Sequence, residues 1–239
     1  MSERTSPLNS IIIGLALVAG LALFGYLLGR AAINVKEYER SVTVKGLAER
    51  EVPADIVLWP IVFTVTDNDL GQLYASIDES QRKIVKFLVA RGIDRQEISS
   101  ALPSITDKSA QQYGGSARPE FRFVATQTVT VYSARVAEVR QAMAGLAELG
   151  KSGIVFSGQN MYGTEYLFTR LNKIKPQMIE EATAKAREVA EKFAADSQSR
   201  LGRIKSASQG QFSITPRDNN NPHLKKVRVV STVEYYLAD

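Results

Sequence analysis

The chain has 239 residues, of which 44% are hydrophobic and 23% charged, and this balance is ordinary for a globular protein. It contains no cysteine and a single histidine, His223, which excludes disulfides, cysteine-ligated zinc, iron–sulfur clusters, thiol nucleophiles and two-histidine metal sites. The net charge of +5 is small and evenly spread, so the composition predicts no binding to nucleic acid.

The first element is an uncharged apolar segment, residues 8–29, which follows a short tail, residues 1–7. As an α-helix it would be about 33 Å long, enough to cross a hydrocarbon core of about 30 Å. A cleavable signal peptide usually has a shorter apolar region, of about 7–15 residues, followed by small residues at the cleavage site. The segment is therefore predicted to be an uncleaved transmembrane signal anchor.

Small residues recur four positions apart in this segment, at Ala16 and Gly20 and again at Gly25 and Gly29. Such spacing lets two membrane helices pack closely, so these four residues are the candidates for helix packing. The alternative interpretation is that glycine and alanine are simply common in membrane helices.

Two arguments about the orientation of the anchor lead to opposite predictions. Basic residues after the segment outnumber Arg4 before it, and by charge alone they would keep the following domain in the cytoplasm. Long domains, however, can cross the membrane regardless of charge.

A linker is predicted at residues 30–40, and a first round of strands and a helix follows it. Residues 69–91 form one apolar stripe at helical spacing, with Asp67 or Asn68 as the cap and Gly92 as the stop. Gly46 is read as the site of a bulge and Pro60 as an edge or bulge position. The predicted strands are residues 41–52, 56–66, 98–106 and 120–132, with a turn at 53–55 and a polar loop at 107–119.

A second round begins with a helix over residues 134–149, stopped by Gly150. One or two strands follow in 155–169, and residues 201–214 and 225–237 form a final hairpin with its tip at 217–223. A long alanine-rich helix over 173–199 has Pro176 in its first turn. Its predicted buried stripe is Ile179, Ala182, Ala186, Val189 and Phe193.

These elements predict an α+β fold, with mixed or antiparallel sheets packed against long helices and one transmembrane helix in front. The chain reads as two ββα-like halves, and strands and helices do not alternate as a doubly wound sheet requires.

The segment VTVKGLAEREVPADIVLWPIVFTVT resembles the opening of SIMPL-domain proteins, with Gly46, Glu49, Pro53 and Asp55 as the structural motif residues. The resemblance continues through the alanine-rich helix and covers residues 41–239. It implies a bacterial envelope protein, linked to stress tolerance, of a family in which some members form ring- or channel-shaped homo-oligomers. It implies no catalytic, cofactor-binding or metal-binding residue, and none is predicted.

The charged residues that stand out each have a structural interpretation. Asp55 is read as a turn residue that accepts backbone N–H groups, and Asp67 and Asp69 as helix-capping residues. His223 lies in an asparagine-rich tip and is expected to be exposed. No spacing brings a partner acid or base to any of them.

Three functional hypotheses remain. The first is a non-enzymatic protein of the inner (cytoplasmic) membrane, single-pass, with residues 41–239 in the periplasm and a homo-oligomer formed by that domain. The second is an envelope module with a pocket of Tyr and Phe side chains that binds a small molecule, peptide or protein, of unknown identity. The third is a carboxylate-dependent hydrolase that uses Asp55 or Asp67.

Overall fold

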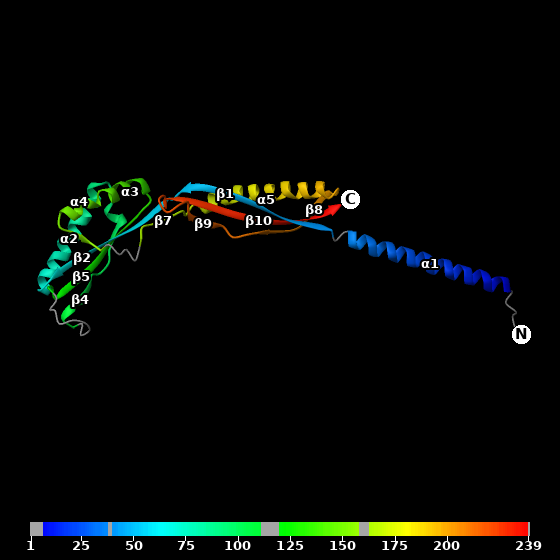
Figure 1. Ribbon diagram of the computed structural model, residues 1–239, viewed down its shortest axis with the longest axis horizontal. Coiled ribbons are helices and arrows are strands. Elements are labelled where there is room, and N and C mark those ends of the chain that lie inside the picture. The colour runs from blue at the N-terminus through cyan, green and yellow to red at the C-terminus, as the bar shows by residue number, and fades with distance from the viewer. Residues whose placement is uncertain (1–6, 38–39, 111–119, 158–162, 239) are drawn as a thin grey trace. The chain divides into compact units, whose positions relative to one another are not determined.

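The computed structural model describes residues 7–37, 40–110, 120–157 and 163–238 (Figure 1). It combines antiparallel sheets with helices, which confirms the predicted α+β class. The chain divides into two compact units that are nested and do not follow the two successive halves expected from the element order. Unit 1 contains Met1–Glu49, Lys175–Phe212 and Arg228–Asp239, and unit 2 contains Arg50–Ile174 and Ser213–Val227.

The N-terminal helix, α1 (Pro7–Glu37), includes the whole predicted apolar segment. It is longer than expected, because residues 30–37 of the predicted linker are also helical. All the side chains from Ile11 to Ala31 are exposed, and this stretch is long and apolar enough to cross a membrane. The helix therefore fits a membrane anchor or a signal segment by its length and composition.

Two long strands, β2 (Ile56–Asp67) and β5 (Phe123–Ser133), form the centre of the sheet in unit 2. They are antiparallel, and their register runs from Val57 opposite Ser133 to Asp67 opposite Phe123. The outer strands pair with them: β3 (Ile98–Ser100) and β4 (Ser104–Asp107) with β5, and β6 (Val155–Phe156) and β7 (Glu165–Leu167) with β2.

Two prolines lie at positions of this sheet where a strand partner is missing or a strand ends. The predicted strand 98–106 is split into β3 and β4, and Pro103 lies in the break. Pro60 lies in the part of β2 between its pairings with β6 and β7, where the described residues provide no ladder partner on that side. Proline has no N–H to donate, so it is tolerated where a partner strand is missing.

Helices cover this sheet: α2 (Leu70–Ala90), α3 (Val136–Ala144) and α4 (Leu146–Lys151), with short 3-10 turns at η1 (Arg95–Glu97) and η2 (Lys108–Ala110) (Figure 1). Every second residue of β2 from Val57 to Phe63 points into the core, as the two-residue period of a strand requires. The core of unit 2 combines these residues with apolar residues of β5, α2 and α3, among them Val57, Trp59, Ile61, Phe63, Val129, Val131, Leu73, Ile77, Leu88 and Val139.

The structure confirms Asp69 as a capping residue of α2 but not Asp67 or Asn68 as its N-cap. Asp69, not Asp67 or Asn68, is the N-cap, and its carboxylate accepts the N–H of Gln72 at 2.9 Å. Asp67 lies just before it and accepts the N–H groups of Asn68 and Asp69. At the other end Gly92 has a positive φ of 83°, which confirms it as the stop.

The predicted helix 134–149 is wrong in its continuity, because Gly145 separates α3 from α4. The Arg91 side chain fills the space beside Gly145, and a β-carbon there would lie 2.8 Å from its guanidinium. That guanidinium stacks on Phe87 at 3.6 Å and pairs with Glu148 at 2.6 Å. Gly150 lies inside α4, and the stop is Gly153, with φ of 93°.

The second sheet has the strand order β1 (Ser41–Pro53), β10 (Leu224–Ala238) and β8 (Arg200–Gln209), and β9 (Ser213–Pro216) also pairs with β10. The predicted strand 201–214 is thus two strands. Helix α5 (Leu171–Asp196), most of which belongs to unit 1, lies along β1 and β10 (Figure 1). The small core of unit 1 contains Val44, Ala186, Ala190, Val233 and Tyr235.

The buried stripe of α5 is largely different from the predicted one. The buried residues are Met178, Ala182, Ala186, Ala190 and Ala194, whereas Val189 is 36% and Phe193 is 55% exposed. Helix α5 also begins earlier than predicted, so Pro176 lies inside it and not in the first turn.

Gly46 on β1 explains why the stripe consists of alanines. A β-carbon at Gly46 would lie 2.5 Å from the backbone N of Ala186 and closer still to the backbone O of Ala182. The helix backbone therefore rests directly on the strand, and only small side chains fit between them. Gly46 is thus required by close helix packing.

Candidate functional site

The turn between β1 and β2, Pro53–Asp55, is the part of the SIMPL-like motif that makes the most polar contacts. The N–H of Ala54 donates to the carbonyl O of His223 at 2.8 Å, and the N–H of Asp55 donates to the carbonyl O of Leu167 at 2.8 Å. All these residues belong to unit 2. The turn thus joins the end of β7 to the start of β10.

The Asp55 carboxylate is the centre of this arrangement, and its side chain is only 7% exposed. Its oxygens accept the N–H of Thr169 at 2.9 and 3.1 Å and the Thr169 hydroxyl at 3.1 Å. They also accept the N–H of Arg170 at 3.2 Å and its guanidinium Nε at 3.0 Å. Both oxygens are therefore occupied by fixed donors.

These donors lie directly before α5, which begins at Leu171. The first N–H groups of a helix have no partner within the helix, and a carboxylate near them is favourable for the helix dipole. Asp55 thus supports the start of α5 from a position 114 residues earlier in the chain. The predicted structural role is close, but the acceptor acts over long range and not within its own turn.

The ionisation of Asp55 agrees with this role. Burial by itself raises the pKa of the Asp55 carboxyl, but the hydrogen bonds from Thr169 and Arg170 outweigh it and leave the pKa below its usual value. A general acid or base near neutral pH needs the opposite shift and a free oxygen. The geometry therefore favours a structural anion.

His223 lies beside this turn, and the expectation that it is exposed is wrong. It is half-buried, and its ring meets that of Tyr166 edge-on at 6.0 Å between centroids. Burial lowers the pKa of His223, and the positive charges of Arg140 and Arg217 lower it further. The asparagine-rich sequence around it gave no signal of this packing.

Two more ionisable side chains in this region are buried. Burial raises the pKa of the Tyr166 hydroxyl, which donates to Met143 Sδ at 3.7 Å. Lys225 is 8% exposed, and burial lowers the pKa of its ammonium group while Glu165 opposes that change. Lys225 was not singled out from the sequence, since a single lysine in a strand carries no pattern.

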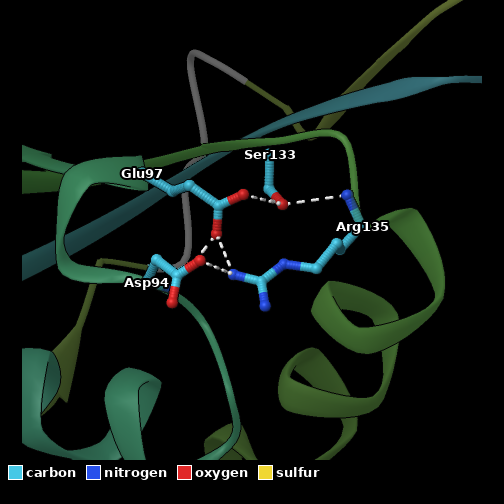
Figure 2. A network of polar contacts seen from close by, with 4 residues as sticks. All are labelled: Asp94, Glu97, Ser133 and Arg135. Atoms are coloured by element: carbon cyan, nitrogen blue, oxygen red, sulfur yellow. Dashed lines mark hydrogen bonds and ion pairs between the residues drawn. The ribbon is translucent and has the colours of Figure 1, made fainter.

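A second polar network joins η1 to the end of β5 (Figure 2). The Arg135 guanidinium pairs with Asp94 at 2.7 Å and Glu97 at 2.6 Å. Ser133 donates to Glu97 at 2.8 Å and accepts the N–H of Arg135 at 3.0 Å. Arg135 is the N-cap residue of α3, so the network fixes the start of that helix.

The two carboxylates of this network do not form an acid–base pair. Burial raises the pKa of Glu97, but its bonds to Arg135 and Ser133 outweigh burial and lower the pKa overall. Both carboxylates are bound by the same arginine, and the capping-box contact between Asp94 and Glu97 further fixes them. This network also favours a structural role.

The remaining predicted site residues belong to unit 1. Glu49 is exposed on β1, with its carboxylate 4.0 Å from Arg228 Nε. In α1, added β-carbons at Gly20, Gly25 and Gly29 would contact nothing in this single chain, so their packing with Ala16 against another helix stays a prediction. Among the described residues no group of three His, Asp or Glu side chains could hold a metal ion.

One small cavity lies over β2 in unit 2, with a volume of about 160 Å³. Ligand pockets are commonly about 300–1,000 Å³, so this one is small for a drug-sized molecule. Its lining is mostly apolar: Trp59, Pro60, Ile61, Val62, Leu146, Phe156 and Ser157.

The family assignment agrees with the motif geometry. The family model SIMPL, described as a protein of unknown function (DUF541), matches residues 42–234, which is most of the chain. The chain belongs to the SIMPL family. The match includes the β1–β2 turn with Asp55, its partners before α5, and both sheets. No curated protein matched the chain. The family description names no function, so membership of the SIMPL family assigns no biochemical activity to the chain.

Proposed function

We propose that this SIMPL protein is a non-enzymatic, membrane-tethered protein of the cell envelope that works by self-association. The observation that carries the proposal is α1, in which every side chain from Ile11 to Ala31 is exposed and uncharged apart from Arg30. Transfer of this surface from water into lipid is favourable by about 25 cal/mol of free energy for each Å² of apolar area that is buried. The helix is therefore favoured in a bilayer, whereas exposure of its apolar surface to water is strongly unfavourable.

The C-terminal end of the proposed membrane segment has residues that favour the membrane–water interface. Arg30 lies over the ring of Tyr26 at 5.7 Å, one turn apart on α1. Tyrosine and arginine are enriched where a helix leaves the hydrocarbon core. We place the membrane boundary near these residues, with the inner membrane as the location and residues 41–239 in the periplasm.

Tethering favours assembly because it confines the domains to one surface. Copies held by short anchors have a high effective concentration, so weak interfaces between them become populated. The motif carboxylate Asp55 and the acids around Arg135 are engaged in structural contacts, which supports an assembly role over the hydrolase hypothesis.

Membrane fractionation of the full chain tests the tether. A protein that carries tags at both ends should sediment with membranes, resist extraction by alkaline carbonate and keep its N-terminal tag. Leu17→Arg places a charge in the middle of the segment, at a cost of about 2.5–3.5 kcal/mol, and should release part of the protein. A soluble protein that has lost the N-terminal tag would show a cleaved signal segment and contradict the proposal.

Orientation is tested separately. Alkaline phosphatase fused after Asp239 is active only outside the cytoplasm, so the proposal expects an active fusion. Activity of a cytoplasmic reporter at the same position would reverse the assigned topology.

A further inference from the structure

The edge of the unit 1 sheet is unusually open at β8. This strand is the last in the order β1, β10, β8, and among the described residues it pairs only with β10. All its residues from Arg203 to Gln209 are exposed, so neither face of this stretch is covered. An exposed edge strand is a template for pairing with another strand.

The two halves of β8 differ in how they are protected. The pairing with β10 is irregular at Glu234, Tyr235 and Leu237, opposite the first half of β8. All three basic residues of β8, Arg200, Arg203 and Lys205, lie in that half. Bulges and lysines are the usual devices that block an edge. The second half, Ser206–Gln209, is regular and uncharged, and its first three side chains are small.

The backbone groups of this second half can be assigned to a side. The N–H of Gly210 donates to Val230 on β10 at 2.8 Å. Successive residues of an antiparallel strand direct their N–H and C=O groups to opposite sides. Ser208 therefore faces β10, and Ala207 and Gln209 direct their N–H and C=O groups to the open edge.

We propose that Ser206–Gln209 of β8 is a self-pairing edge, and that its occupant is the same segment of a second copy in antiparallel orientation. The inference rests on the proposed self-association and names its interface. A register centred on Ser208 sets Ala207 opposite Gln209 of the second copy, with all four outward-facing groups of each strand hydrogen-bonded across the edge.

The charge pattern of β8 favours a second copy in this orientation. Antiparallel pairing about Ser208 places Lys205 opposite Gln211, and no two basic residues face each other. A parallel pairing in register would align all three basic residues with themselves, which is destabilising. A few strand hydrogen bonds make a weak interface in free solution, and the shared membrane anchor supplies the effective concentration that it needs.

The cysteine-free sequence makes a direct test simple. In the full chain in native membranes, Ser208→Cys places one thiol at the centre of the pairing, where the two α-carbons would be about 4.5 Å apart. This separation allows a disulfide. The matched control is Ser206→Cys on the same strand face, for which the two α-carbons would be about 14 Å apart.

With a mild oxidant, the Ser208→Cys chain should form a covalent dimer roughly ten times faster than the Ser206→Cys chain. Ala207→Pro removes an outward-facing N–H without touching the bonds to β10. Added to Ser208→Cys, it should abolish the rapid cross-linking while the far-ultraviolet circular dichroism spectrum stays unchanged.

Three results would overturn the inference in distinguishable ways. Equal cross-linking rates, in a chain that is oligomeric by size, would reject the β8 edge and leave self-association intact. A cross-linked species that is not twice the chain mass would assign the edge to another protein. A chain that stays monomeric in the membrane would reject both the edge and the proposed self-association.

Discussion

Replacing Gly46 by alanine should destabilise the SIMPL domain far more than an ordinary surface change. The added β-carbon would overlap the backbone O of Ala182 and lie 2.5 Å from the backbone N of Ala186. Backbone atoms cannot rotate away as a side chain can, so α5 has to move off β1. That movement loosens the buried alanines and the contacts of Val44 and Val233 in the same core.

The expected magnitude follows from the cost of overpacking. Extra methyl groups in a close-packed core cost about 1–3 kcal/mol, and contact with backbone atoms places Gly46→Ala near the upper end, at about 3 kcal/mol. Gly150→Ala is the matched control, since a β-carbon there meets nothing and the residue lies inside α4. Alanine is the better helix former by about 0.8–1 kcal/mol, so this variant should be neutral or slightly more stable.

Urea unfolding of the full chain in mild detergent, followed by circular dichroism at 222 nm, measures both variants against the original protein. The reasoning about Gly46 is refuted if Gly46→Ala unfolds within about 0.5 kcal/mol of the original chain. An equal loss in Gly150→Ala would also refute it, because the effect would then belong to glycine replacement in general.

Three further predictions follow from the polar contacts and from burial. Asp55→Asn should cost about 1–3 kcal/mol of unfolding free energy. The pKa of Asp55 is lowered from 3.8, so the stabilisation that its carboxylate provides is present above that pH and lost as pH falls through the folded pKa. Unfolding measured from pH 6 to 2 should therefore depend less on acid in this variant. An acid dependence equal to that of the original chain contradicts the assignment. Arg122 and then Ser109 hold the pKa of Asp107 at about 2, so Arg122→Gln should raise it toward 3.8, as carboxyl-carbon NMR titration would show; an unmoved titration rejects the ion pair. Phe193→Ser should change stability by less than about 0.5 kcal/mol because the ring is exposed, and a loss above about 2 kcal/mol in the same urea assay would place the ring in a core.

The sequence is sufficient to predict the elements whose signals are local. The apolar stripe of α2, the capping aspartates before it and Gly92 after it lie within one continuous segment. The alternating pattern of β5 and the length of α1 are also local properties. These elements appear in the structure with small shifts at their ends.

The features that were missed depend on residues distant in the chain. Val189 and Phe193 are the larger apolar residues of α5, and hydrophobicity alone places them in the core. The core instead takes the alanines, because Gly46, far earlier in the chain, brings the helix backbone against β1. The close approach of the Arg91 side chain to Gly145 is likewise a contact between residues that are distant in the chain.

The candidate site shows the same division. The motif identifies Asp55 as important, but its partners Thr169 and Arg170 are more than 110 residues away and form no recognisable spacing with it. Burial of His223 depends on Tyr166, which follows from the pairing of β7 with β2. Such contacts become visible only when the strand order is known.

The most direct test of the central claim is the mass of the full chain, extracted with its lipids and measured by native mass spectrometry. The account predicts particles that contain several copies of a chain that still carries residues 8–29. Single chains, or chains that begin after Ala31, would contradict a membrane-tethered protein that acts by self-association.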